Sequence, residues 1–353
     1  MKIGVLNNLY GPFQKGGAEK VVAKMISDWR AAGHEVFLIT TKPSGAATPP
    51  ETDFPVYYLP SRYYDLVKTG IFYRFFWQLN NLCSKKKSRA IKKILLHAKP
   101  DLVMTHNLMG LGFQTPRLLR KMGIRHEHFL HDIQLLHPSG LMFYGQESQV
   151  DSRAARVYQS ITRRCFASPA KIISPSRWLL DEHVRRGFFA NSDHEVRPFQ
   201  KAAEKPGAHD FKEPARNFLF VGQMTKAKGI YLLLDAFKKL DNPAARLVMI
   251  GSGSELENVK QIARSDSRIS VEPWSENTET RQLGAGDYLI VPSLCYENSP
   301  TIIAKAHDLG SRIIASDLGG IPEIILKNDI LFTPAGSEEL RKILEKVSAA
   351  NIY

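Results

Sequence analysis

One carboxylate, Glu297, precedes a predicted helix start in the segment 292–323, PSLCYENSPTIIAKAHDLGSRIIASDLGGIPE. Ser299 is a favoured N-cap residue, and Pro300 suits the first helical position because it lacks an N–H that would have no partner there. The helix dipole would favour an anion at this end. The backbone N–H groups expected to face that anion are those of Asn298, Ser299 and Thr301. A carboxylate beside a phosphate-sized site predicts a phosphorylated ligand that also carries hydroxyl groups.

A second group of candidate residues lies in the stretch 218–237, FLFVGQMTKAKGIYLLLDAF. A strand ends at Gly222, and Lys228 and Gly229 lie just before the next predicted helix. A lysine in such a turn is a compact charge for phosphate oxygens. Taken alone, an exposed lysine turn is the better interpretation.

Four histidines, at positions 126, 128, 131 and 137, fall within HEHFLHDIQLLHPSG. A strand would place 126 and 128 on one face and 131 on the other. No acidic cluster accompanies them, so we expect no metal site. A structural role for His131 remains an alternative to a functional one.

These motifs, taken in order, resemble the retaining glycosyltransferases of the GT-B fold, whose pattern is Glu, seven residues, Glu, then a Gly-Gly-x-Pro-Glu turn. Glu297 and the turn GGIPE match this pattern, but the second acidic position is Lys305. Gly16 and Gly17 in YGPFQKGGAE resemble the family's Gly-Gly-x-Glu entry loop, which approaches the donor's phosphate. The loop is not a GxGxxG fingerprint, so dinucleotide binding is poorly supported.

The resemblance assigns roles to individual residues. It implies that Glu297 binds hydroxyls of the donor sugar, that Lys228 binds the diphosphate, and that His131 lies by the reacting centre with Asp132 orienting this region. Gln223 stands where the family has an Arg, and an amide supplies neither charge nor the guanidinium fork.

Lys305 is the other departure, because the family's Glu accepts hydrogen bonds from ribose hydroxyls and an ammonium group accepts none. Two arrangements are open. Lys305 turns toward the diphosphate and replaces the charge missing at Gln223, or it pairs with a carboxylate of its own domain. We expect the first.

The elements that would position these residues alternate between short β-rich runs and amphipathic helices, the rhythm of parallel α/β sheets. The Pro-rich stretch 198–216 interrupts it and reads as a linker. We therefore expect an α/β GT-B fold with two Rossmann-like domains facing a central cleft: residues 1–197 on the acceptor side and 217–353 on the donor side. A chain of 353 residues suffices for two cores.

Charge is unevenly distributed. Residues 1–197 carry a net +14 and residues 198–353 a net −1, which together give the +13 of the whole chain. Residues 62–99 contain ten Lys or Arg, one acid and many aromatic side chains, which favours contact with an anionic membrane surface. A solvated helix over a core segment is the alternative. No nucleic-acid motif accompanies the basic residues.

Three scattered cysteines, no signal peptide and no apolar run long enough to span a bilayer predict a cytoplasmic protein, peripheral at most at the inner face of the membrane. The resemblance implies transfer of a sugar from a nucleotide diphosphate sugar to a hydroxyl acceptor, in cell-surface polysaccharide or glycolipid synthesis. A lipid-linked acceptor is one of the alternatives. The resemblance also implies retention and neither metal nor cofactor. The alternatives are a GT-B binding or scaffold protein weakened by Gln223 and Lys305, and a sugar-nucleotide epimerase.

Overall fold

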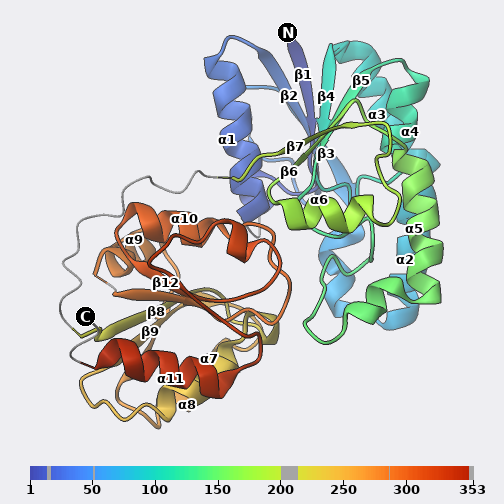
Figure 1. Ribbon diagram of the computed structural model, residues 1–353. Coiled ribbons are helices and arrows are strands. Elements are labelled where there is room, and N and C mark those ends of the chain that lie inside the picture. Colours follow the sequence, from blue (N-terminus) through green and yellow to red (C-terminus); the bar gives the residue numbers. More distant parts are fainter. Residues whose placement is uncertain (14–16, 51, 200–213, 286, 350–353) are drawn as a thin grey trace. The chain divides into compact units, whose positions relative to one another are not determined.

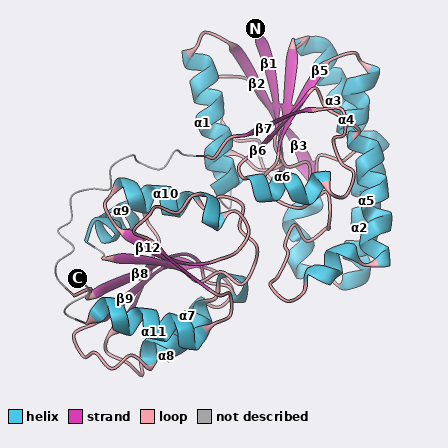
Figure 2. Ribbon diagram, in the orientation of Figure 1, coloured by secondary structure: helices cyan, strands magenta, loops and turns pink. Residues whose placement is uncertain are grey.

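The computed structural model describes residues 1–13, 17–50, 52–199, 214–285 and 287–349. The described chain forms two compact units, each built on a parallel sheet with helices (Figures 1 and 2). Unit 1 contains Met1–Leu141 and Ser148–Arg197, and unit 2 contains Met142–Glu147 and Pro198–Tyr353. Most of the predicted linker, together with Gly16, lies outside the described residues.

Unit 1 has a sheet of seven described strands in the order β3-β2-β1-β4-β5-β6-β7, all parallel. Its strands are β1 (Lys2–Leu6), β2 (Glu35–Pro43), β3 (Val56–Ser61), β4 (Leu102–Thr105), β5 (Arg125–Phe129), β6 (Lys171–Ser174) and β7 (Asp193–Val196). Its helices are α1 (Gly17–Ala31), α2 (Ile71–Cys83), α3 (Lys85–Ala98), α4 (Thr115–Lys121), α5 (Arg153–Phe166) and α6 (Arg177–Val184). The central strands β1 and β4 are buried at every position except Lys2, which explains why their sequences are continuous apolar runs.

Unit 2 has a sheet of six described parallel strands in the order β10-β9-β8-β11-β12-β13. Its strands are β8 (Asn217–Gln223), β9 (Arg246–Ser252), β10 (Ile269–Pro273), β11 (Tyr288–Val291), β12 (Arg312–Ser316) and β13 (Ile330–Phe332). Its helices are α7 (Ile230–Lys238), α8 (Leu256–Ala263), α9 (Glu276–Ala285), α10 (Thr301–Asp308) and α11 (Ser337–Ser348).

Each sheet reverses its strand order beside its first strand, between β1 and β4 in unit 1 and between β8 and β11 in unit 2. Ligands of such sheets bind outside the carboxyl ends of the strands at this switch point. The doubly wound order confirms the predicted pair of Rossmann-like domains.

A short segment of the first half of the chain, Met142–Glu147, belongs to unit 2. Phe143 forms an antiparallel bridge with Cys295, and the backbone N–H of Tyr144 donates to Leu294 O at 2.9 Å. The Tyr296 side chain also donates to a carboxylate oxygen of Glu147 at 2.9 Å. The sequence had placed this segment in the first domain, and only long-range backbone pairing moves it.

Candidate active site

The centre of the unit 2 site is an ion pair between Lys228 and Glu297. Lys228 ends the 3-10 helix Lys226–Lys228 that follows β8, and Glu297 lies in the loop between β11 and α10. The Ser293 hydroxyl donates to the same carboxylate oxygen, Oε1, at 2.8 Å. Burial lowers the pKa of Lys228, but the charge of Glu297 outweighs it, so the pKa is raised and the ammonium form is held.

The two loops that carry this pair are tied together by backbone hydrogen bonds. The carbonyl of Ala227 accepts from the N–H groups of Leu294 and Cys295 at 2.9 and 3.1 Å. Gly229 has a φ of +67°, and a Cβ there would lie 1.7 Å from the carbonyl oxygen of Pro292. Only glycine allows this approach, so the loops hold Lys228 and Glu297 in fixed register.

The predicted turn GGIPE also contacts this site. Gly319 forms a parallel bridge with Glu297, and the Gly320 N–H donates to the Glu297 carbonyl at 2.7 Å. Gly319 has a φ of +66°, and a Cβ there would lie 2.3 Å from that carbonyl. The turn therefore supports the backbone that presents the Glu297 carboxylate.

Both the Lys228 ammonium and the Glu297 carboxylate can form further hydrogen bonds. Within the described residues, no protein group donates to Glu297 Oε2, and the Lys228 ammonium bonds only to Glu297. A carboxylate oxygen accepts further hydrogen bonds, and an ammonium has three donors. The pair can therefore bind hydroxyls on one side and phosphate oxygens on the other.

Helix α10 begins at Thr301, with Pro300 as its N-cap residue and without a side-chain cap. The predicted N-cap at Ser299 is therefore one residue too early, because Pro300 is still extended (φ −62°, ψ 113°). Ser299 is buried in the turn before it. The N-terminus of α10 lies four residues after Glu297. Its unsatisfied N–H groups and the positive end of its dipole are the features that the predicted anion site requires.

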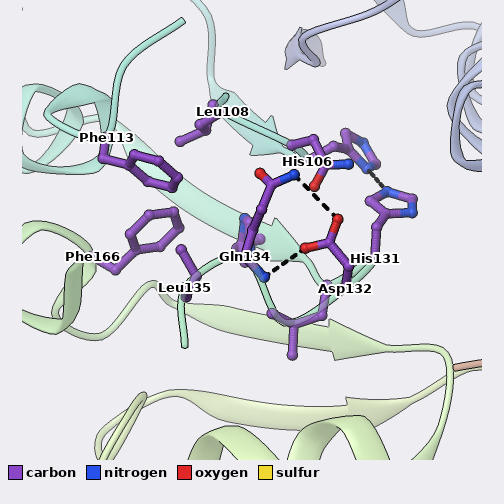
Figure 3. Close-up of a pocket in the computed structure, with 11 residues that line it drawn as sticks. His106, Leu108, Phe113, His131, Asp132, Gln134, Leu135 and Phe166 are labelled. Atoms are coloured by element: carbon purple, nitrogen blue, oxygen red, sulfur yellow. Dashed lines mark hydrogen bonds between the residues drawn. The ribbon is translucent and has the colours of Figure 1, made fainter. Parts of the chain in front are cut away.

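In unit 1, His131 and Asp132 follow β5 and line a small cavity of about 10 Å³, roughly the space that one water molecule needs (Figure 3). His131 Nε2 lies 2.8 Å from His106 Nδ1, and the His131 ring stacks on Phe129. Burial lowers the pKa of His131 to about 3, so the imidazole is neutral at neutral pH. It can donate or accept a hydrogen bond there but carries no charge.

Asp132 is held by the residue two positions later. The backbone N–H of Gln134 donates to Oδ1 at 2.7 Å, and its side-chain amide donates to Oδ2 at 3.3 Å (Figure 3). Burial raises the pKa of Asp132 to about 6, although these bonds and one from Asn107 oppose the shift. A carboxyl group with a pKa near neutrality can hold or release a proton under working conditions.

Two other histidines of this motif, His126 and His128, are buried in unit 1. His126 and His128 lie on one face of β5, as predicted, and both contact Thr105 Oγ1, at 2.7 and 2.8 Å. Burial lowers the pKa of His126 to about 3 and that of His128 well below its usual range. Within the described part of the chain, no three His, Cys, Asp or Glu side chains are grouped to hold a metal ion.

Two glycosyltransferase family patterns match this chain. The pattern of Glycosyltransferase Family 4 matches residues 15–198, and that of Glycosyl transferases group 1 matches residues 215–349. The chain belongs to glycosyltransferase family 4. The two matches together span both units, so the resemblance inferred from the motifs is confirmed.

Relatives of this glycosyltransferase are distant. An uncharacterized 42.6 kDa protein from the cps region of Klebsiella pneumoniae is 25% identical over 338 residues, 92% of this chain and 87% of that protein. The putative teichuronic acid biosynthesis glycosyltransferase TuaC of Bacillus subtilis is 24% identical, over 61% of this chain and 56% of its own.

Solved structures show the same fold. The sucrose-phosphate synthase of Thermosynechococcus elongatus aligns with a TM-score of 0.66 at 16% identity, covering 99% of this chain and 91% of that one. Anabaena HepE in complex with UDP aligns with a TM-score of 0.66 at 14% identity, covering 99% and 92%. Both are GT-B glycosyltransferase structures, and at this identity the likeness concerns the fold.

The two departures from the family pattern differ in their surroundings. Gln223 is exposed at the end of β8. Lys305 projects from α10, and its ammonium donates to Glu279 Oε1 at 2.6 Å. Trp274 Nε1 donates to the other oxygen of Glu279, also at 2.6 Å. The expectation that Lys305 replaces the charge missing at Gln223 is therefore wrong, and the second arrangement, pairing within its own domain, is observed.

Several residues of the two sites were not found from the sequence. His106 and Asn107 follow directly on β4, so the rule that ligands meet the carboxyl ends of parallel strands could have identified them. Glu279 lies on α9, 26 positions before Lys305. No local signal connects the two, because only the tertiary fold brings their side chains together.

Proposed function

We propose that this chain transfers a sugar from a nucleotide diphosphate sugar to a hydroxyl acceptor, with retention of the anomeric configuration and without a metal ion. The observation that carries the proposal is the Lys228–Glu297 pair, held by two glycine-dependent loops directly before the N-terminus of α10. Structures of the same fold support the donor class, since HepE is bound to UDP in one and to UDP-glucose in another. The relatives favour an acceptor in surface polysaccharide synthesis.

In this mechanism, Lys228 and the first N–H groups of α10 bind the diphosphate and stabilise the charge that builds as it leaves. Glu297 Oε2 accepts hydrogen bonds from hydroxyls of the transferred sugar. The acceptor hydroxyl attacks from the face on which the diphosphate departs. Neutral His131 hydrogen-bonds the sugar near the reacting carbon, and Asp132 orients this part of unit 1.

Nucleotide binding tests the donor half of the proposal. Lys228→Ala should weaken UDP or GDP at least tenfold and the matching monophosphates much less, because the lost charge faces the distal phosphate. Lys226→Ala is the matched control, since Lys226 is exposed in the same 3-10 turn and does not touch Glu297. Isothermal titration of both variants decides the point. Equal losses for diphosphates and monophosphates would overturn the role of Lys228.

A second candidate function is a nucleotide-sugar-binding protein with weak or no turnover. Gln223 and the Lys305–Glu279 pair favour it, because each removes a donor contact that the family supplies. Binding of a nucleotide sugar without release of its nucleotide in the presence of a pool of glycan acceptors would support this alternative.

A further inference from the structure

Helix α2 exposes an apolar stripe to solvent. Phe72, Phe76 and Leu79 have exposed fractions of 80%, 66% and 44%. Their spacing of four and three residues places them on one face of the helix. Tyr73, beside them, is 39% exposed. This face departs from the usual pattern of a surface helix, whose apolar side faces the core.

The opposite face of α2 is anchored to unit 1. Asn81 is buried. Its side-chain oxygen accepts a hydrogen bond from the Gly110 N–H at 2.9 Å, and its backbone carbonyl accepts one from the Phe113 N–H at 3.1 Å. Trp77 packs on Tyr63, with ring centroids 6.0 Å apart. The exposed stripe is therefore held outward by fixed contacts.

Helix α3 follows α2 after the single residue Ser84, which caps it by accepting from the Lys87 N–H. Its exposed positions recur at helical spacing, and most are cationic: Lys85, Lys86, Arg89, Lys92 and Lys93. Residues 71–99 contain no Asp or Glu. The exposed apolar stripe of α2 is therefore followed directly in the sequence by the positively charged face of α3.

Lys87 does not belong to that face. Its ammonium donates to the carbonyl of Gly110 and lies 3.2 Å from Ser61 Oγ. Burial lowers its pKa to about 8. Lys87 therefore fastens α3 to the loop after β4, and the cationic face consists of the five side chains named above.

We propose that α2 and α3 form a membrane-docking surface that binds an anionic lipid bilayer. Aromatic and leucine side chains enter the interface between headgroups and acyl chains, and lysines and arginines attract anionic headgroups. A second copy of the chain fits poorly, because a symmetric contact would bring the same cations together. In the described part of the chain, no helix is long and apolar enough to cross a bilayer.

The inference extends the proposed function by naming where the acceptor would lie, at or in an anionic membrane surface. It rests on the surface residues alone and not on Lys228 or Glu297. A binding measurement without donor or acceptor therefore tests it separately, so its failure and the failure of the proposed glycosyl transfer are distinguishable.

Flotation with vesicles tests the proposal. The full chain should float with vesicles of phosphatidylcholine and phosphatidylglycerol and not with phosphatidylcholine alone, most strongly at low salt because screening is weak there. Replacing Lys85, Lys86 and Lys92 by Gln should weaken binding at least tenfold, since each charge contributes about fivefold. The matched control replaces three exposed lysines of unit 2: Lys327, Lys342 and Lys346.

The apolar stripe has its own variant. Phe72→Ser with Phe76→Ser should reduce vesicle binding at least tenfold while the melting temperature stays near that of the wild type, because both side chains are exposed. Val157→Ser is the control, since Val157 is 62% exposed on α5. Absence of binding to anionic vesicles, equal losses in the control variants, or a dimer in light scattering that these substitutions abolish would overturn the proposal.

Discussion

The pair of Lys305 and Glu279 offers the sharpest test of the unit 2 site, through Lys305→Glu. The substitution restores the family's acidic residue but places a second carboxylate next to Glu279, whose side chain is 8% exposed. Breaking a buried pair costs about 3–5 kcal/mol. We take about 3 kcal/mol, the low end, because the Lys305 side chain is 29% exposed and solvent weakens the interaction.

That loss predicts a fall of about 6–12 °C in the melting temperature of unit 2, since a domain of this size loses about 2–4 °C per kcal/mol. Two adjacent carboxylates raise each other's pKa, so the folded variant binds more protons than the unfolded one. Its stability relative to wild type should therefore fall as pH rises from 5 to 8. Scanning calorimetry across this range measures both effects.

The charge-swapped variant, Lys305→Glu with Glu279→Lys, separates stability from recognition. It should recover part of the lost melting temperature, because the opposite charges are paired again, but a lysine at position 279 cannot accept the hydrogen bond from Trp274 Nε1. It also places a carboxylate at position 305, as in the family pattern. Nucleotide binding should therefore be tighter than in the wild type if this position binds the ribose hydroxyls. A Lys305→Glu variant that melts within about 1 °C of wild type would refute the reasoning, because the pair would then carry no stability.

Three further outcomes are expected. Glu297→Gln should keep the fold and sharply reduce use of a nucleotide sugar, as measured by nucleotide release, and an unchanged rate would contradict its role. His131→Ala should lower turnover more than donor affinity, whereas full activity with a lower melting temperature would support a structural role. Acid should unfold unit 1, because burial depresses the pKa values of His126, His131 and His183 to about 3, 3 and 4, so the unfolded state takes up protons that the folded state does not. Stability should fall as pH drops below about 6.5, by about 2 kcal/mol per histidine at pH 5, which circular dichroism can follow.

The alternation of strands and helices and the family follow from the sequence alone. The buried apolar runs and the helical spacing between them predict a parallel α/β chain, because each strand and helix must bury its own apolar surface. Gly229 and Gly319 follow from local rules as well, since a tight turn with a positive φ needs glycine. The ordered motifs around Lys228 and Glu297 then sufficed to name the family.

Which charged groups meet depends on the tertiary structure. Lys228 and Glu297 are 69 positions apart and join because the loops after β8 and β11 lie at the same edge of the sheet. Glu279 on α9 contacts Lys305 on α10 only in the folded chain, and the Lys87 ammonium donates to the Gly110 carbonyl instead of joining the exposed cationic face. A lysine has the same ammonium group wherever it stands in a sequence. Its role depends on the hydrogen-bond acceptor that the fold places beside it.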